Sequence, residues 1–410
     1  MSGFESVLAG LDTELGWVRD FYTHLHRHPE VSLEEQQTSA LVAEKLASFG
    51  CEVTHLGGTG VVGVLTNGEG PTVLARADMD ALPVTEATGL PYSSEVDGVM
   101  HACGHDVHVS TLLGAAKLMA DGREAWSGTY IALFQPAEEI GAGSQAMVDD
   151  GLVTKVPRPD VALSQHVMPI AAGTLATTAG PVLSAGDSLK ITVYGKGAHG
   201  SMPHMAVDPV VLASSIVLRL QTVVSRETKP GDFAVVTVGA LNAGTKSNII
   251  PDRATLLLNI RTYSNQVRKD VLAAIERIVR GECVTAGSPQ EPEFEYYDQF
   301  PLTSNDAAVT EKVTDAFTRH FEAGAVLQAT PQTASEDFSR IPDAFGVPYT
   351  FWLLGGHDPE KYRAAVERGT VSQDIPGNHS PFFAPVLDPT LSLGVQAQVV
   401  AAMSYLAKDA

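Results

Sequence analysis

The sequence has few cysteines and few basic residues for its length. Its 410 residues include only three cysteines, Cys51, Cys103 and Cys283. Their number is odd and they lie far apart, so we expect no disulfide framework. Lysine and arginine total 27 against 48 acidic residues, which gives a formal net charge of −21. Because nucleic-acid binding needs clustered cationic side chains, we expect no nucleic-acid partner.

Long hydrophobic runs are also lacking. No uninterrupted apolar stretch approaches the roughly 18 residues that a membrane span needs. The opening segment MSGFESVLAGLDTELGWVRD contains acids and no basic stretch followed by an apolar one, so no signal peptide is expected. We therefore expect no membrane association and a location in a reducing cytoplasm.

The length and the pattern of apolar segments indicate the fold class. A chain of 410 residues exceeds what one hydrophobic core usually supports, so two domains are expected. Short apolar segments alternate with amphipathic helical patterns, which predicts an α/β layer fold with a mostly parallel sheet. The predicted strands are 71–77, 129–135, 160–165 and 347–354, and the predicted helices include 13–26, 34–49 and 107–121.

The middle of the chain follows a different order. Its segments read as strand, helix, two strands, helix and strand, which is the α+β ferredoxin-like arrangement. The segments are 187–195, 208–227, 233–241, 253–263, 265–282 and 293–298. We predict that residues 184–298 form a domain inserted into a catalytic domain made of residues 1–183 and 299–410.

Residues typical of metal sites gather where predicted strands end. The stretch MHACGHDVHVS (100–110) contains three histidines, one cysteine and one aspartate, and further acids and histidines follow other strands. In open α/β sheets, sites form at the carboxyl ends of strands, so these side chains are expected to converge. The candidates are Cys103, His105, Glu138, Glu139, His166 and His379. For His101 and His108 we favour a structural or supporting role.

This set of side chains suits metal-assisted amide hydrolysis. Mixed sulfur, nitrogen and oxygen ligands favour Zn²⁺, with Mn²⁺ second and Co²⁺ or Ni²⁺ as further options. Hydrolysis needs an activated water, which divalent metal ions provide, and a carboxylate that moves its proton. Of the adjacent acids Glu138 and Glu139, one can bind metal and the other can face the water. The residues alone leave open which does which.

Eight motifs, in order along nearly the whole chain, carry a family resemblance. The chain resembles the metallopeptidase-related amidohydrolase family of aminoacylases, hippurate hydrolases and auxin-conjugate hydrolases. The motifs are LHRHPE (25–30), RADMDALPVTE (76–86), MHACGHDVH (100–108), FQPAEE (134–139), GKGAHGSMPH (195–204), NIIPD (248–252), SEDF (335–338) and GNHSPFF (377–383).

The resemblance implies a site with two divalent metal ions. Cys103 matches the ligand that bridges the metals in the cysteine-bridged branch of the family. Glu138 matches the general base, and Asp78 matches an acid that orients a metal ligand. Arg76 departs from the wider superfamily, which has a histidine ligand at that position. The remaining ligands match His105, Glu139, His166 and His379.

The resemblance also implies roles for the inserted domain as a lid and a dimerisation surface. His199 matches a histidine that contacts the substrate carbonyl or its oxyanion, and Asn248 and Arg261 match groups that bind the substrate carboxylate. The implied substrate is a small N-acyl amino acid, and the implied assembly is a homodimer or a higher oligomer.

Three other functions compete with an N-acyl amino acid hydrolase. A dipeptidase on the same scaffold is the nearest. A zinc nucleobase deaminase is disfavoured, because its combined H-x-E and P-C-x-x-C signature is absent. A non-catalytic metal-binding protein needs ligands but no extra base, so Glu138 argues against it.

Overall fold

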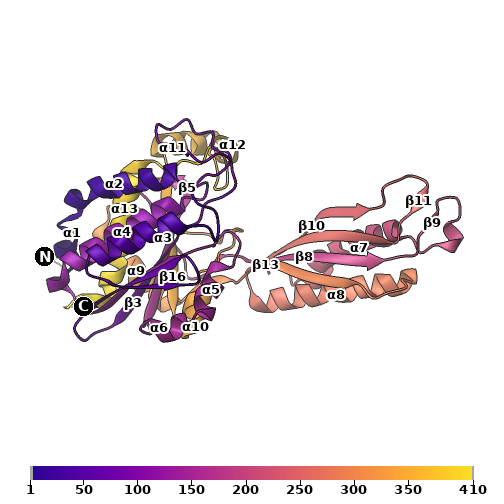
Figure 1. The fold of residues 1–410 in the computed structure, drawn as a ribbon, viewed down its shortest axis with the longest axis horizontal. Coiled ribbons are helices and arrows are strands. Elements are labelled where there is room, and N and C mark those ends of the chain that lie inside the picture. The colour runs from indigo at the N-terminus through magenta and orange to yellow at the C-terminus, as the bar shows by residue number, and fades with distance from the viewer. Residues whose placement is uncertain (1–2, 409–410) are drawn as a thin grey trace. The chain divides into compact units, whose positions relative to one another are not determined.

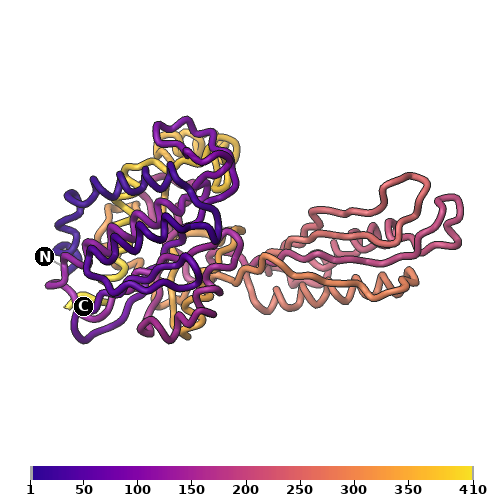
Figure 2. The backbone as a smooth tube through the Cα atoms, viewed as in Figure 1, coloured from indigo at the N-terminus to yellow at the C-terminus, as the bar shows by residue number. Residues whose placement is uncertain are grey.

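The chain forms two compact units in the computed structural model, which describes residues 3–408. The predicted catalytic domain also includes residues 1–2 and 409–410, which lie outside the described residues. The first unit comprises the chain up to Val182, Ser304–Thr330 and the chain from Asp337 onward. In Figure 2 it combines indigo and yellow segments from the two ends of the chain. The second unit comprises Leu183–Thr303 and Pro331–Glu336.

An eight-stranded mixed sheet organises the first unit (Figure 1). Its four central strands are parallel, and antiparallel pairs occur toward both edges. Helices pack against these central strands and bury them almost throughout. The predicted α/β class is confirmed. Across the sheet the strands are β1 (Glu52–Leu56), β2 (Gly60–Asn67), β4 (Gly128–Gln135), β3 (Thr72–Asp78), β5 (Val161–Ala171), β16 (Tyr349–His357), β6 (Leu175–Thr177) and β15 (Val326–Gln328).

Helix α4 (His105–Asp121) is buried along most of its length and anchors the site described below. It packs against α13 (Leu387–Leu406) and α2 (Leu11–Arg27). Gly114 permits this approach, because a Cβ there would lie 2.8 Å from Val395. The remaining helices of the unit are α1 (Gly3–Leu8), α3 (Gln36–Ser48), η1 (Arg123–Ala125), α5 (Gly143–Asp149), α6 (Leu152–Lys155), α9 (Ala307–His320), α10 (Arg340–Phe345), α11 (Pro359–Arg368) and α12 (Val371–Asp374).

The second unit is a four-stranded antiparallel sheet with two long helices. Its core contains alternate side chains of the strands packed against the helices, as the period-two pattern predicted. The predicted β-α-β-β-α-β order is present. Its elements are β8 (Ala185–Tyr194), α7 (Pro209–Thr222), β10 (Ala234–Ala243), β12 (Arg253–Thr262), α8 (Asn265–Ala286) and β13 (Glu293–Phe300). Smaller elements are β9 (Ala198–His199), η2 (Pro203–Met205), the π-helical turn η3 (Val223–Glu227) and β11 (Ile249–Ile250), while β7 (Gly180–Leu183) pairs with β14 (Thr303–Asn305).

The boundaries of the second unit differ from the predicted 184–298. Strand β13 continues to Phe300, which pairs with Gly186, so the unit ends at Thr303. The backbone of Ser184 also donates to the carbonyl of Ala334 over 2.8 Å. This contact brings a distant segment, residues 331–336, into the second unit.

Two elements of the first unit also have other bounds than predicted. The strand predicted over 160–165 continues through His166 to Ala171 and pairs with β16 along most of this length. The strand predicted over 129–135 ends at Gln135 as expected, since Pro136 cannot donate to the ladder and Ala137 has φ 47°. The helix predicted from 107 begins at His105 instead, directly after Gly104 with φ 84°. Both changes concern segments that carry candidate ligands.

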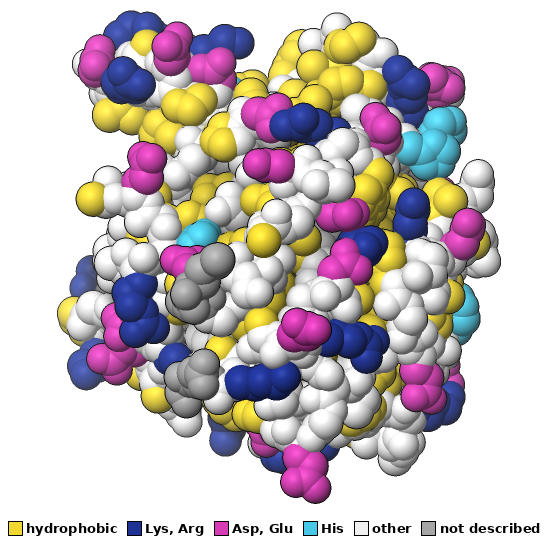
Figure 3. Space-filling model, turned by 90° about the vertical axis from the view of Figure 1, so that its left-hand side faces the viewer, with side chains coloured by type: hydrophobic (Ala, Val, Ile, Leu, Met, Phe, Trp, Pro, Cys, Tyr) yellow, Lys and Arg dark blue, Asp and Glu magenta, His cyan; other side chains and the backbone are white. Residues whose placement is uncertain are grey.

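The length of the described helices and the charge on one face of the surface are relevant to membrane and nucleic-acid binding. No described helix combines the length and apolar character that crossing a membrane requires. On the face drawn in Figure 3, acidic and basic side chains are interspersed, and the described residues form no broad basic patch there. That face lacks the clustered cations that binding to a nucleic-acid backbone requires.

A buried ion-pair network joins α2 to the start of α4. The Nδ1 atom of His26 lies 2.6 Å from a carboxylate oxygen of Asp106, and its Nε2 atom lies 3.4 Å from Glu86. Burial disfavours a charged imidazole, but these hydrogen bonds outweigh burial and raise the pKa of His26 to about 9. His26 is therefore protonated in the folded protein at neutral pH.

The raised pKa predicts a pH-dependent stability. His26 titrates near 6.5 when unfolded, so its contribution is fully present below that pH and is lost as pH rises through about 9. The shift corresponds to roughly 3 kcal/mol. Urea unfolding of wild type and His26→Gln, both with chelator, should show the destabilisation shrinking by that amount between about pH 6 and pH 10. A constant difference across this range would contradict the assignment.

Candidate metal centre

The carboxyl ends of the central strands bring the candidate ligands together. Cys103 forms one group with His105 and His166, and a second group with Glu139 and His379. Within each group the ligand atoms lie within 4.8 Å of one another. The two groups share only the Cys103 sulfur, which is the arrangement that a bridging thiolate between two metal ions requires.

Individual distances describe a compact cluster. The Cys103 sulfur lies 3.5 Å from Nε2 of His166, and Nε2 of His379 lies 3.3 Å from a Glu139 oxygen. The other Glu139 oxygen lies 3.8 Å from Nε2 of His105. All five ligand side chains thus point into one small volume beside the central strands of the sheet.

Two buried atoms in this cluster show that the residues fit a metal. Nε2 of His105 and Oε1 of Glu139 have no hydrogen-bond partner among the described residues. Leaving such an atom unpaired costs about 1–3 kcal/mol, so an unpaired nitrogen beside an unpaired carboxylate oxygen indicates a bound cation. The thiol, imidazole and carboxylate donors are those of a borderline divalent ion such as Zn²⁺.

The electrostatics of the cluster set the protonation states that a metal ion meets. Hydrogen bonds with Cys103 and Glu139 raise the pKa of His379 to about 10, although burial opposes the charge. Burial also disfavours charge on His105, but the carboxylates of Asp78 and Asp80 outweigh it and raise the pKa of that imidazole. Metal binding at this site must therefore displace protons.

Asp80 is a supporting residue to which the sequence interpretation gave no role. Its Oδ1 atom lies 3.3 Å from Nδ1 of His105, so it holds the ring nitrogen opposite Nε2. The same carboxylate accepts the backbone N–H of Glu138 at 3.1 Å and of Glu139 at 3.0 Å, and the hydroxyl of Ser32 at 2.6 Å. The signal was available, because Asp78 and Asp80 are two residues apart at a strand end.

Asp78 supports a different part of the cluster. Its carboxylate lies 2.5 Å from Nδ1 of His108 and 2.7 Å from the guanidinium of Arg76. Nε2 of His108 accepts the backbone N–H of Val167, the residue after His166. Asp78 thus reaches Val167 in the middle of β5 through His108, while Nδ1 of His105 faces Asp80. That Asp78 orients a ligand stays a prediction.

Asn378 is a second supporting residue to which the sequence interpretation gave no role. Its amide donates to the carbonyls of Cys103 and Val167, over 3.1 and 3.2 Å. The backbone N–H of His379 donates to Ala102, and His379 itself has φ 69°. Asn378 thus ties its own loop to the loop of Cys103 and to strand β5. Only its position beside a candidate ligand in GNHSPFF could have indicated this.

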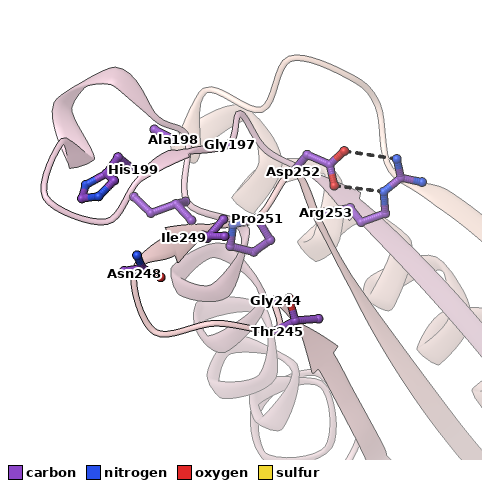
Figure 4. Close-up of a pocket in the computed structure, with 11 residues that line it drawn as sticks. Gly197, Ala198, His199, Gly244, Thr245, Asn248, Ile249, Pro251, Asp252 and Arg253 are labelled. Carbon is purple, nitrogen blue, oxygen red and sulfur yellow. Dashed lines mark hydrogen bonds and ion pairs between the residues drawn. The ribbon is translucent and has the colours of Figure 1, made fainter.

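The other candidate residues lie in the second unit. His199 and Asn248 line a pocket of about 690 Å³ formed around the β9–β11 ribbon (Figure 4). Nδ1 of His199 lies 2.7 Å from the Ser201 hydroxyl. Arg261 is not among the residues lining this pocket. Its guanidinium hydrogen-bonds Asn259 and Ser335, and burial lowers its pKa.

Comparison with known proteins identifies the family. Residues 74–370 match the family model described as peptidase family M20/M25/M40. The chain belongs to this family. This confirms the resemblance seen in the motifs, which names a group of amidohydrolases related to metallopeptidases.

Several M20 relatives cover most of the chain. An N-acetyl-L-cysteine deacetylase of Bacillus subtilis is 37% identical over 86% of this chain and 83% of its own. A hippurate hydrolase of Campylobacter jejuni is 39% identical over 80% of this chain and 85% of its own. A thermostable carboxypeptidase of Saccharolobus solfataricus is 36% identical over 95% of each chain. A crystal structure described as a dinuclear metal-binding M20 peptidase of B. subtilis is 27% identical, covers 96% of this chain and 99% of its own, and has a TM-score of 0.78.

The shared position of Cys103 predicts how metal is lost. Cys103→Ala should weaken binding at two positions at once, by roughly 100-fold or more each, because each ligand group loses its thiolate. Elemental analysis after dialysis should find up to two divalent ions per wild-type chain and fewer than one in the variant. Cys51→Ala, at a free cysteine of the same unit, is the control and should keep the wild-type content. Loss of a single ion would argue against a bridge.

Proposed function

We propose that the chain is a metal-dependent amidohydrolase that removes the acyl group from N-acyl amino acids. The observation that carries this is the pair of ligand groups sharing Cys103, with the carboxylate of Glu138 beside them. Relatives named as an N-acetyl-L-cysteine deacetylase and a hippurate hydrolase support this substrate class. Small N-acyl amino acids are therefore the substrates to test first.

Five residues would hold two divalent ions, for which we favour Zn²⁺, with Mn²⁺ second and Co²⁺ or Ni²⁺ as further options. When bound, such ions supply Lewis acidity, which polarises an amide carbonyl and lowers the pKa of water. Cys103 must be a free thiol to bind them, which fits a reducing compartment such as the cytoplasm. The five are Cys103, His105, Glu139, His166 and His379.

We assign Glu138 to proton transfer rather than to metal binding. Its carboxylate forms a group with His105 and Glu139, but it belongs to neither group that contains Cys103. The side chain is buried, and its backbone N–H is held by Asp80. In the proposed mechanism Glu138 accepts a proton from the attacking water and delivers it to the leaving nitrogen.

The second unit supplies candidates for substrate binding. His199 would donate a hydrogen bond to the scissile carbonyl or its oxyanion, and Asn248 and Arg261 would bind the substrate carboxylate. His199 and Asn248 share one pocket, which supports a common role. We further propose a homodimer, possibly part of a higher oligomer, in which this unit acts as lid and interface.

Peptides remain the second candidate class of substrate, because two relatives are named thermostable carboxypeptidases. Competing assays on N-acetyl, benzoyl, long-chain acyl and indole-acetyl amino acids and on free dipeptides distinguish the two. A higher kcat/KM on dipeptides than on every N-acyl amino acid would replace the deacylase proposal with a dipeptidase.

The adjacent acids should respond differently to removal of their charge. Glu138→Gln should keep its metal ions yet lower kcat by roughly 10²–10⁴-fold, the usual effect of losing a positioned general base. Glu139→Gln should instead lose metal, because Glu139 belongs to the group with Cys103 and His379. Metal content and kcat measured on the same preparations decide the matter. The opposite pattern would exchange the two roles.

Mixing inactive variants tests whether His199 acts on the partner's site. If it does, a heterodimer of Glu138→Ala and His199→Ala has one complete site and one that lacks both groups. Random pairing makes about half of the dimers mixed, so activity should return to roughly a quarter of wild type. The control pair, Glu138→Ala with Cys103→Ala, should stay inactive. Mixed dimers confirmed by mass but without activity would show that His199 does not act in trans.

A further inference from the structure

Two buried carboxylates hold the turn that carries Glu138 and Glu139. Three successive backbone N–H groups after β4 each donate to an acid from a distant part of the chain. Ala137 donates to Glu35 over 2.8 Å, and the next two residues donate to the two oxygens of Asp80. Glu35 thus holds the residue that precedes Glu138, while Asp80 holds the backbone of both acids.

The turn has an unusual backbone that needs such support. Ala137 is buried and has φ 47°, a left-handed conformation that residues with a Cβ rarely adopt. It lets adjacent Glu138 and Glu139 leave the strand without pointing to opposite faces of the sheet. The chain then closes tightly on itself, since a Cβ at Gly143 would lie 1.5 Å from the carbonyl oxygen of Pro136. A strained turn of this kind persists only where its surroundings hold it.

Glu35 is itself rigidly placed. It is fully buried, and its second oxygen accepts the hydroxyl of Thr59 over 2.6 Å. It directly precedes α3, and the carboxylate of Glu30 accepts the backbone N–H groups of Gln37 and Thr38 in the first turn of that helix. The N-terminal segment around LHRHPE, which the metal site does not use, therefore ends in a fixed acceptor for Ala137.

We propose that Glu35 is a positioning residue that fixes the direction of the Glu138 carboxylate through the N–H of Ala137. The proposal rests on the proposed role of Glu138 as general base. Glu35 hydrogen-bonds no side chain of the candidate metal ligands among the described residues, whereas Asp80 also contacts His105. Glu35 can thus be changed without touching the ligands, and it is the better test of positioning.

Three substitutions separate hydrogen bonding from charge. Glu35→Ala removes the acceptor for Ala137 and should lower kcat about 100-fold with little change in KM, as expected when a reacting group is misplaced. Glu35→Gln keeps an oxygen for Ala137 and offers an N–H to Thr59, so it should recover most of the lost kcat. Glu35→Asp keeps the charge but is one methylene shorter and should behave like Glu35→Ala. The exposed neighbour Glu34→Ala is the matched control and should match wild type.

Readouts other than activity distinguish positioning from general damage. All variants should retain the wild-type metal content by elemental analysis. Hydrogen exchange of the peptide spanning 134–143 should accelerate in Glu35→Ala and Glu35→Asp but not in Glu35→Gln. If Glu35→Ala does not fold, Glu35→Asp carries the same test.

A double variant links the effect to Glu138. Because Glu35 acts through Glu138, Glu35→Ala combined with Glu138→Gln should be no slower than Glu138→Gln alone. Multiplied losses, lost metal, or an unchanged kcat in both Glu35→Ala and Glu35→Asp would overturn the positioning role. Full activity of Glu138→Gln would instead overturn the general-base assignment itself, whatever the Glu35 variants show.

Discussion

The site depends on the hydrogen bonds that the buried carboxylate of Asp80 accepts. A carboxylate removed from water is stable only when its oxygens are hydrogen-bonded. Asp80 is satisfied by Ser32, by the backbone N–H groups of Glu138 and Glu139, and by contact with His105. The donors come from the N-terminal segment, the turn after β4 and the start of α4. Satisfying one charge therefore assembles three segments that are remote in sequence.

Rigid packing behind the site gives this assembly its precision. Gly104 precedes α4 in a left-handed conformation, and a Cβ there would lie 2.3 Å from a methyl group of Val167. The loop holding Cys103 consequently lies directly against the middle of β5, which carries His166. Because α4 is buried against α13 and α2, its first residue, His105, cannot move independently of the core.

The sequence was sufficient to predict the sheet and the convergence of the candidate ligands, but not the supporting roles of Asp80, Asn378 and Glu35. The end of an apolar strand followed by acids indicated Glu138 and Glu139 as candidates, because apolar strands and their carboxyl ends are visible as local patterns. Asp80 also follows a strand, but neither its position nor those of Asn378 and Glu35 indicate their hydrogen-bond partners. Each acts by accepting or donating a hydrogen bond across 50 or more residues, and that partnership exists only once the chain has folded. For the same reason, the sequence does not predict that residues 331–336 belong to the second unit, since this depends on their contact with Ser184.

The same contacts explain why the fold tolerates features that destabilise it. Ala137 and His379 have positive φ angles, and His105 and Glu139 each keep a buried atom unpaired by the described protein. Each such feature costs free energy in the metal-free chain. A cation would relieve the unpaired atoms, but it would not by itself create the turn at Ala137. The turn is held by Glu35 and Asp80, so the protein scaffold determines where Glu138, the proposed general base, points before any metal or substrate arrives.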